Sequence, residues 1–221
     1  MSVWNIIYIY REGLLAGLLV TLELSLSVWV IGIILGTFFG YLGSKFKVEI
    51  GFPSRFISFI LSGIPMLVLL FWLHYPLQAI LHININPFYT AIFALSVVNT
   101  FAVADLVRSA LNNFPSQYSL AAKMCGLTQR DTFLKIEMPI ILRQIIPTLL
   151  SIQVNMLQLT LFASLISVEE IFRVAQRINS LIYKPIEIYS ALAFFFLIIC
   201  LPLNGLASWL RVRFTRDISE S

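Results

Sequence analysis

Residues 120–126 read Leu-Ala-Ala-Lys-Met-Cys-Gly and residues 136–139 read Ile-Glu-Met-Pro, and both stretches lie in a polar segment at about 112–144 between two hydrophobic runs. Six charged residues occupy this segment: Lys123, Arg130, Asp131, Lys135, Glu137 and Arg143. Charged side chains are costly inside hydrocarbon. In so hydrophobic a chain, the segment is therefore expected to be a structured loop outside the lipid, where it can contact another protein.

Composition places the chain among polytopic membrane proteins. Its 221 residues are 59% hydrophobic and only 12% charged, with a mean hydropathy of +0.89, which lies well outside the range of a soluble domain. We expect a single transmembrane domain over residues 1–221. The net charge of +4 does not indicate nucleic-acid binding, because the basic residues flank hydrophobic runs, where lipid and topology explain them.

Cysteine and histidine give no sign of a disulfide or a metal site. Cys125 and Cys200 lack the spacing of a metal or redox motif and are expected at different membrane depths. His74 and His82 have no further ligand at a suitable spacing. The N-terminus lacks the basic lead and cleavage site of a secretory signal, so the first hydrophobic run is expected to stay in the mature protein.

Five runs are long enough to cross roughly 30 Å of hydrocarbon as helices, at about 14–41, 56–81, 88–111, 145–166 and 188–210. Pro65 and Pro202 interrupt the second and fifth runs and are expected to kink them. Gly32, Gly36 and Gly40 recur every four residues, which predicts a bare stripe of backbone for close helix contact. The alternative is that glycine is simply frequent in membrane helices.

The basic residues predict an orientation. Eleven Lys and Arg residues follow the first, third and fifth runs, against four on the other side. Because cytoplasmic loops are enriched in Lys and Arg, this asymmetry places the N-terminus outside and both the C-terminus and the polar segment in the cytoplasm. Between the fourth and fifth runs, apolar residues at helical spacing over 167–180 predict a short amphipathic helix at the outer membrane surface.

The polar segment resembles the Glu-Ala-Ala loop of permease subunits in binding-protein-dependent ABC importers. That loop continues after three residues with Gly and after nine more with Ile-x-Leu-Pro, and five positions match at this spacing: Ala121, Ala122, Gly126, Ile136 and Pro139. Leu120 stands in place of the family's Glu, and Met138 in place of its Leu.

The similarity extends to the polar amino acid branch of these permeases. Matching positions lie on both sides of the loop: Asp105, Arg108, Pro115, Pro147, Thr160, Ser164, Ile166 and Glu170. Gln158 and Leu161 depart from the branch, which has Lys and Ser there.

The resemblance implies a type I ABC importer transmembrane domain, which is an all-α integral membrane protein of five transmembrane helices with a cytoplasmic coupling loop. It implies a polar amino acid permease of a bacterial inner membrane that forms half of a two-permease pore, as a homodimer or a heterodimer. The implied partners are a cytoplasmic ABC ATPase dimer, an extracytoplasmic substrate-binding protein and membrane lipid. The chain has no Gly-x-x-x-x-Gly-Lys phosphate loop, so ATP and Mg are expected on the ATPase, with no cofactor or catalytic residue here.

Within the loop, residues 116–126 are predicted to form a short helix whose apolar face enters a groove on the ATPase. Ser116 or Ser119 is expected to cap its start, and Gly126 suits a left-handed exit turn. The predicted coupling residues are Leu120, Ala121, Ala122, Met124, Gly126, Ile136 and Pro139. The alternative is a helix that merely lies on the bilayer surface.

Polar residues at mid-depth of the membrane are candidates for the substrate path, and they are Glu23, Asn99, Asn155, Gln158 and Thr160. Glu23 is expected to face a cationic or ammonium group. The alternative is that these residues form hydrogen bonds between helices. Asp105 and Arg108 lie three residues apart and are predicted to pair as a structural brace.

Three other functions remain as alternatives. A secondary transporter or channel subunit would use an ion gradient through Glu23 and Asp105, and its uptake would survive ATP depletion. An intramembrane enzyme would need a convergent set of His, Asp or Ser, which the motif spacing does not provide. A membrane scaffold would copurify with no ATPase.

Overall fold

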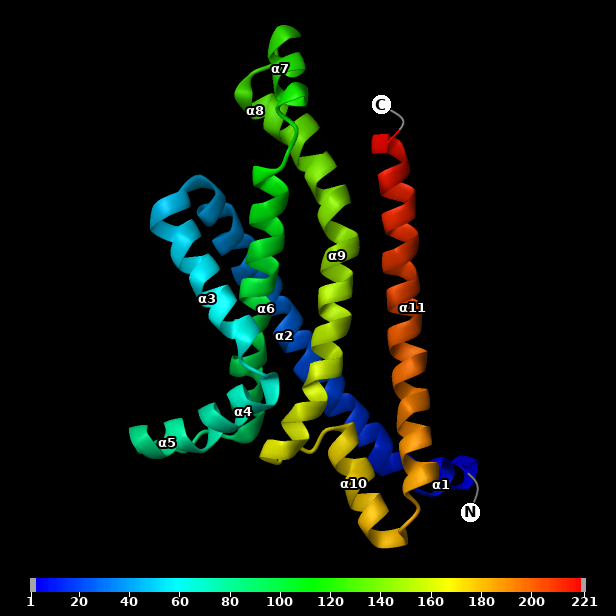
Figure 1. The fold of residues 1–221 in the computed structure, drawn as a ribbon. Coiled ribbons are helices and arrows are strands. Elements are labelled where there is room, and N and C mark those ends of the chain that lie inside the picture. The colour runs from blue at the N-terminus through cyan, green and yellow to red at the C-terminus, as the bar shows by residue number, and fades with distance from the viewer. Residues whose placement is uncertain (1–2, 220–221) are drawn as a thin grey trace.

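The computed structural model describes the backbone of residues 3–219 and the side chains of residues 3–214, and the described chain folds as helices without a strand (Figure 1). The helices in chain order are α1 (Val3–Ile9), α2 (Arg11–Lys45), η1 (Lys47–Gly51), α3 (Phe52–Gly63), α4 (Met66–His74), α5 (Pro76–Leu81), α6 (Pro87–Asn112), α7 (Ser116–Met124), α8 (Gln129–Thr132), η2 (Phe133–Glu137), α9 (Met138–Leu159), η3 (Thr160–Ile166), α10 (Ile171–Ile182) and α11 (Pro185–Ser219). The predicted all-α fold class is confirmed.

Four helical segments within residues 3–219 are long and apolar enough to cross a membrane: α2, α6, Gln129–Ile166 and Pro185–Phe214. Each contains one of the predicted hydrophobic runs, because apolar residues fill at least one full membrane thickness in each. The helix α11 continues through Pro202 as one uninterrupted helix.

The second predicted run, at 56–81, is not one straight span. The chain bends by 98° between Lys47–Gly63 and Met66–Leu81, and counting this pair as one broken span brings the total to five. Ile64 is extended, as is usual before a proline, and Pro65 has no N–H with which to continue the helix. Figure 1 shows α4 and α5 turning sideways below α3. The kink predicted at Pro65 is therefore confirmed, and the bent pair is compatible with the predicted second span as a broken one.

The helices α2 and α6 cross in direct backbone contact. Cβ atoms built at Gly32, Gly36 and Gly40 would lie 2.2, 2.6 and 2.7 Å from atoms of α6, closer than the 3.0 Å limit that real Cβ contacts respect. Only glycine therefore permits this approach. The predicted close contact along the glycine stripe is confirmed, and its partner is a helix of the same chain.

The amphipathic helix predicted at 167–180 is α10, which begins slightly later, at Ile171. Its apolar face is buried in a cluster with residues of α1, α2 and α11. That face consists of Ile171, Val174, Ala175 and Ile178.

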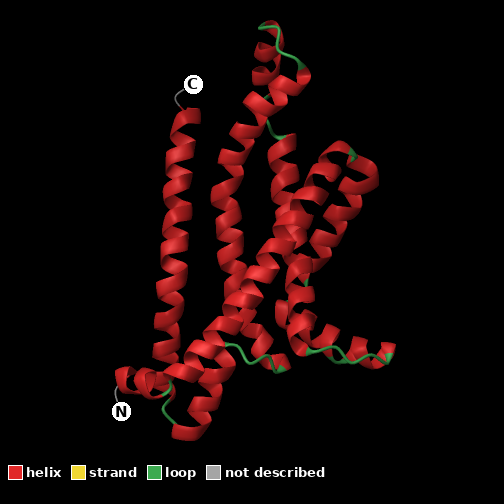
Figure 2. Cartoon of the chain, turned by 180° about the vertical axis from the view of Figure 1, so that it is seen from behind, coloured by secondary structure: helices red, strands yellow, loops and turns green. Residues whose placement is uncertain are grey.

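The loop elements stand at opposite ends of the molecule. In Figure 1, α7 and α8 share one end with the C-terminal end of α11, whereas α1, α5 and α10 lie at the other end. Figure 2 shows the same separation of the two termini from behind. This arrangement is what an odd number of membrane crossings requires.

Candidate coupling helix and polar helix junction

The helix α7 ends in a left-handed turn at Gly126, where φ is +76°. The Gly126 N–H donates to the Lys123 carbonyl at 3.0 Å, and the Leu127 N–H donates to the Ala122 carbonyl at 3.1 Å. These two bonds form a Schellman motif, which satisfies carbonyl groups at the end of the helix. The predicted left-handed exit turn is confirmed.

The start of α7 differs from the prediction. Pro115 occupies the N-cap position, and no side chain caps the first turn. The expected cap by Ser116 or Ser119 is therefore wrong. The Ser119 hydroxyl donates instead to Glu137 Oε1 at 2.5 Å, so it ties α7 to η2. Pro115 can hold this position because its extended backbone leads directly into the first helical turn.

Three apolar residues of α7 are exposed beside the polar Ser116, Gln117 and Lys123. Leu120 is 62% exposed and Met124 is 83% exposed, and Ala121 lies exposed between them. We call Leu120, Ala121 and Met124 the coupling face. Ala122 is buried and packs inward, so it supports the helix rather than its outer surface. An exposed apolar patch at the tip of a structured loop is typical of a protein-binding site.

The segment from α8 to α9 connects the coupling face to a membrane helix. Thr128 Oγ1 accepts from the Asp131 N–H at 3.1 Å and caps α8, and Lys135 pairs with Asp131 at 2.7 Å. Ile136 is half-buried in η2. Pro139 stands in the first turn of α9, where its missing N–H needs no partner. The path from α7 to α9 is therefore mostly helical and is held by side-chain bonds.

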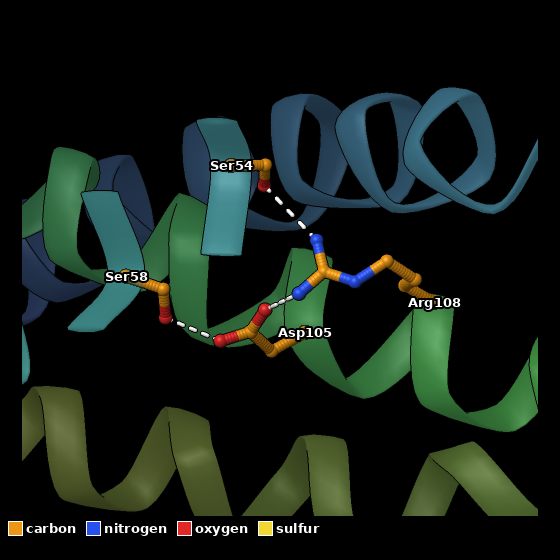
Figure 3. Close-up of polar contacts among 4 residues, drawn as sticks. All are labelled: Ser54, Ser58, Asp105 and Arg108. Carbon is orange, nitrogen blue, oxygen red and sulfur yellow. Dashed lines mark hydrogen bonds and ion pairs between the residues drawn. The ribbon is translucent and has the colours of Figure 1, made fainter. Parts of the chain in front are cut away.

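A polar brace joins α6 to α3 near the same end of the molecule (Figure 3). Arg108 pairs with Asp105, as predicted, and its Nη1 donates to Ser54 Oγ at 3.2 Å. The Ser58 hydroxyl donates to the other Asp105 oxygen. The ion pair thus has neutral hydrogen-bonding partners on α3, which lowers the cost of placing it beside lipid.

An amide junction joins α2, α6 and α9. Asn99 Nδ2 donates to the Val28 carbonyl and to Gln153 Oε1, both at 3.0 Å. Gln153 Nε2 donates back to Asn99 Oδ1 at 3.3 Å, and Trp29 Nε1 donates to the Gln153 carbonyl at 2.9 Å. Asn99 is completely buried, as is Thr160, which begins η3 and donates to the Leu157 carbonyl at the end of α9. Both candidates are therefore placed inside the chain, and Asn99 joins three helices whereas Thr160 bonds within the segment of α9 and η3.

The other three substrate-path candidates are exposed on the isolated chain: Glu23, Asn155 and Gln158. Glu23 lies six residues before Trp29, about 9 Å along α2. Gln158 lies five residues after Gln153, about 8 Å along α9, and the two helices run in opposite directions. Since Trp29 bonds Gln153, Glu23 and Gln158 lie at a similar depth, on the α10 side of the amide junction. A carboxylate exposed at this depth requires a polar environment.

Glu170 forms a buried cap at the opposite end of the molecule from α7. Its carboxylate accepts from the Phe172 N–H at 2.9 Å and from the Arg173 N–H at 2.7 Å, and no part of the residue is exposed. Burial raises the pKa of Glu170 to about 7, although the two backbone donors oppose this shift. Beside it, Thr21 Oγ1 accepts from the Ile171 N–H at 3.1 Å and links α10 to α2.

Residues 13–217 match the family of the binding-protein-dependent transport system inner membrane component. The chain belongs to this family. The matched residues include both the membrane-spanning helices and α7, so one family accounts for both features. We therefore call the chain a permease below.

Relatives and solved structures agree with this assignment. The octopine transport system permease protein OccM of Rhizobium meliloti is 28% identical over 186 residues, which cover 80% of this chain and 76% of OccM. The glutamate/aspartate import permease protein GltK of Escherichia coli O157:H7 is 24% identical over 218 residues, which cover 95% and 97% of the two chains. A solved structure described as an amino acid ABC transporter with histidines matches with a TM-score of 0.84 at 23% identity, over 96% of this chain and 99% of that chain. This likeness confirms the type I importer fold.

Metal-binding groups do not converge in the part of the permease that the structure describes. No three His, Cys, Asp or Glu side chains among the described residues are placed to hold an ion. Cys125 is exposed and Cys200 is buried, and both are free thiols.

Several polar residues were missed by reasoning from sequence. Gln153 was not among the candidates, because its role as the partner of Asn99 depends on how α6 meets α9. Ser54 and Ser58, four residues apart on α3, carry a detectable signal, because polar residues at that spacing share one face of a helix. The capping role of Glu170 could also have been predicted, because it is an acidic residue directly before an amphipathic helix.

Proposed function

We propose that this permease forms half of the translocation pore of an ATP-driven importer for polar amino acids. In this proposal a second permease subunit, identical or different, completes the pore, and a substrate-binding protein delivers the cargo from outside. A separate cytoplasmic ABC ATPase dimer carries ATP and Mg, and this chain supplies no cofactor. The N-terminus lies outside and the C-terminus inside a bacterial inner membrane. The observation that carries the proposal is the exposed coupling face at the tip of a structured loop in a chain of this family.

The substrate class is supported by the relatives and by Glu23. Octopine, glutamate and aspartate, which the names of OccM and GltK specify, all carry an amino acid group. A carboxylate exposed at membrane depth is suited to an ammonium or cationic group. We therefore assign Glu23, Asn155 and Gln158 to the path and place Asn99 and Thr160 behind it as supports for the helices.

Coupling follows from the connections within the chain. Movement of the ATPase subunits would displace the coupling face, and the bond between Ser119 and Glu137 would carry this displacement into η2. The helix α9 begins directly after η2. Because α9 also carries Gln153, its movement would change the amide junction and the polar residues beyond it.

Aspartate substitutions on the coupling face test this proposal. Leu120→Asp and Met124→Asp place a charge where an apolar groove is expected, and both positions are exposed, so the isolated fold should be kept. We expect loss of ATPase copurification and of ATP-dependent uptake in proteoliposomes, with an unchanged melting temperature. Gln129→Asp, on the exposed surface of α8, is the matched control. Normal ATPase binding by both coupling-face variants would refute the assignment of this face.

The energy source separates this function from its main alternative. Uptake that continues without ATP and collapses with the ion gradient would identify a secondary transporter or channel subunit instead. Glu23→Gln tests the path in the same vesicles, because it removes the charge and keeps the shape. We expect weaker uptake of cationic or ammonium-bearing substrates, and unchanged affinity and selectivity would remove Glu23 from the path.

A further inference from the structure

A basic cavity of about 440 Å³ lies at the end of the membrane helices that is nearer to α7. It is bounded by the turn between α2 and α3 and by the end of α6. Its polar lining consists of Lys47, Arg55, Arg108 and Asn112. None of these residues belongs to the coupling face or to the amide junction, so the transport role proposed above does not account for the cavity.

The charges around the cavity do not balance. Among the described side chains, Arg108 has Asp105 as its ion-pair partner, whereas neither Lys47 nor Arg55 has one. Arg55 lies close enough to Arg108 for the two positive charges to repel each other. Three cations line the cavity and no carboxylate does, so an anion placed among them would relieve the repulsion.

The backbone leaves room for such an anion beside a fixed donor. Arg108 is 4% exposed and is held by Asp105 and Ser54. A Cβ at Gly43 would lie 3.6 Å from Arg108 Nη1, so the absence of a side chain there keeps the guanidinium open toward the cavity. The guanidinium has five N–H donors, and these two partners leave others for a ligand.

Apolar side chains border the same cavity. Val48 is 81% exposed and Phe52 is 68% exposed, and both line it. In water these side chains would be unfavourably placed, but at a membrane surface they can lie among acyl chains while the basic residues reach the headgroups. This pairing of apolar border and basic interior matches a phospholipid and not a free ion.

We propose that this cavity binds the phosphate headgroup of an anionic phospholipid from the cytoplasmic leaflet. Lys47 and Arg55 would supply mobile cations from the surface, and Arg108 would supply the fixed donor at the back. Oδ1 of Asn112 accepts from Ser44 at 3.0 Å, which leaves its Nδ2 as the group available to the phosphate. The proposal depends on the orientation proposed above, because it places this end of the helices at the inner membrane surface.

Lipid retention by the full chain tests the proposal. The permease is placed in phosphatidylcholine nanodiscs that contain a minor fraction of phosphatidylglycerol, and bound lipids are counted by native mass spectrometry. We expect phosphatidylglycerol to be enriched on the wild type. Lys47→Gln with Arg55→Gln should reduce this enrichment by about 30-fold, the factor expected for two basic residues near an anionic surface. Arg108 stays unchanged, because it is held in the brace with Asp105.

A matched control and a second ligand make the result decisive. Arg143→Gln with Arg213→Gln removes two charges from the same end of the chain outside the cavity, and it should keep the enrichment. Equal loss in both double variants, or no enrichment on the wild type, would overturn the proposal. Inorganic phosphate is added in parallel to the permease in pure phosphatidylcholine nanodiscs, and bound phosphate is counted in the same way. Retention of phosphate equal to that of phosphatidylglycerol would show that the ligand is a free anion. Transport is not measured, so failure here leaves the proposed import function standing.

Discussion

Replacing Glu170 by glutamine should remove a pH dependence from the stability of the permease. The pKa of Glu170 rises from its ordinary value of 4.5 to about 7 in the fold. Burial is the largest cause, and the neighbouring Glu169 adds to it, whereas hydrogen bonds from Phe172, Arg173 and Thr21 oppose it. The folded protein therefore binds this proton more tightly than the unfolded chain does.

The sign and size of the effect follow from linkage. A raised pKa means that stability is greatest below pH 4.5, falls as the pH rises toward about 7, and stays constant above that value. The difference between 4.5 and about 7 corresponds to roughly 3 kcal/mol. Because the glutamine side chain is neutral at every pH and can still accept an N–H bond through Oε1, the Glu170→Gln variant should lose this dependence while keeping a cap on α10.

The assay is thermal unfolding of both proteins in detergent between about pH 5 and pH 8. The wild-type melting temperature should fall across this range, whereas that of Glu170→Gln should change much less. Glu12→Gln is the control, because Glu12 is exposed and does not contribute to the raised pKa of Glu170. Parallel curves for the wild type and Glu170→Gln would refute the buried, proton-binding state of Glu170.

Three further tests address the packing of α2 on α6, the exit turn of α7 and the polar brace. Gly36→Leu should lower stability by about 1–3 kcal/mol through overpacking between α2 and α6; Gly63→Leu, where the space is open, should leave the melting temperature unchanged. Gly126→Ala forces a side chain into a left-handed turn at a cost of about 1–2 kcal/mol, and pull-down should show weaker ATPase binding with the spans intact. Arg108→Leu leaves Asp105 without its cation and should cost about 1–3 kcal/mol in unfolding measurements, because Asp105 is partly exposed and keeps its bond from Ser58. Adding Asp105→Asn to Arg108→Leu should recover part of that loss, and no recovery would contradict the brace.

The helices were predictable where local residues alone decide the outcome. Long apolar runs identified α2, α6, α9 and α11 because no other structure satisfies their backbone groups in hydrocarbon. The spacing of Gly126 after Ala122 predicted the exit turn, because a left-handed residue is most easily glycine. The glycine stripe predicted a close contact, although not which helix would provide it.

Prediction was less successful where the answer depended on distant parts of the chain. Pro65 predicted a kink, but the 98° bend that breaks the second span is also a matter of how α4 packs against the other helices. Ser119 was expected to cap its own helix and instead bonds Glu137, which lies eighteen residues later. Local propensity could not indicate that competing partner.

Sequence by itself determined that this chain lies in a membrane, where its helices run, and which short loop resembles a coupling element. These properties depend on hydrophobic length and on residue spacing, which are written in consecutive residues. Tertiary structure alone decided that Asn99 bonds Gln153 and that Glu170 is buried at the start of α10. It also decided that Lys47, Arg55 and Arg108 line one cavity. Such groupings join residues from separate helices, so they exist only once helix packing has fixed the depth and rotation of each segment.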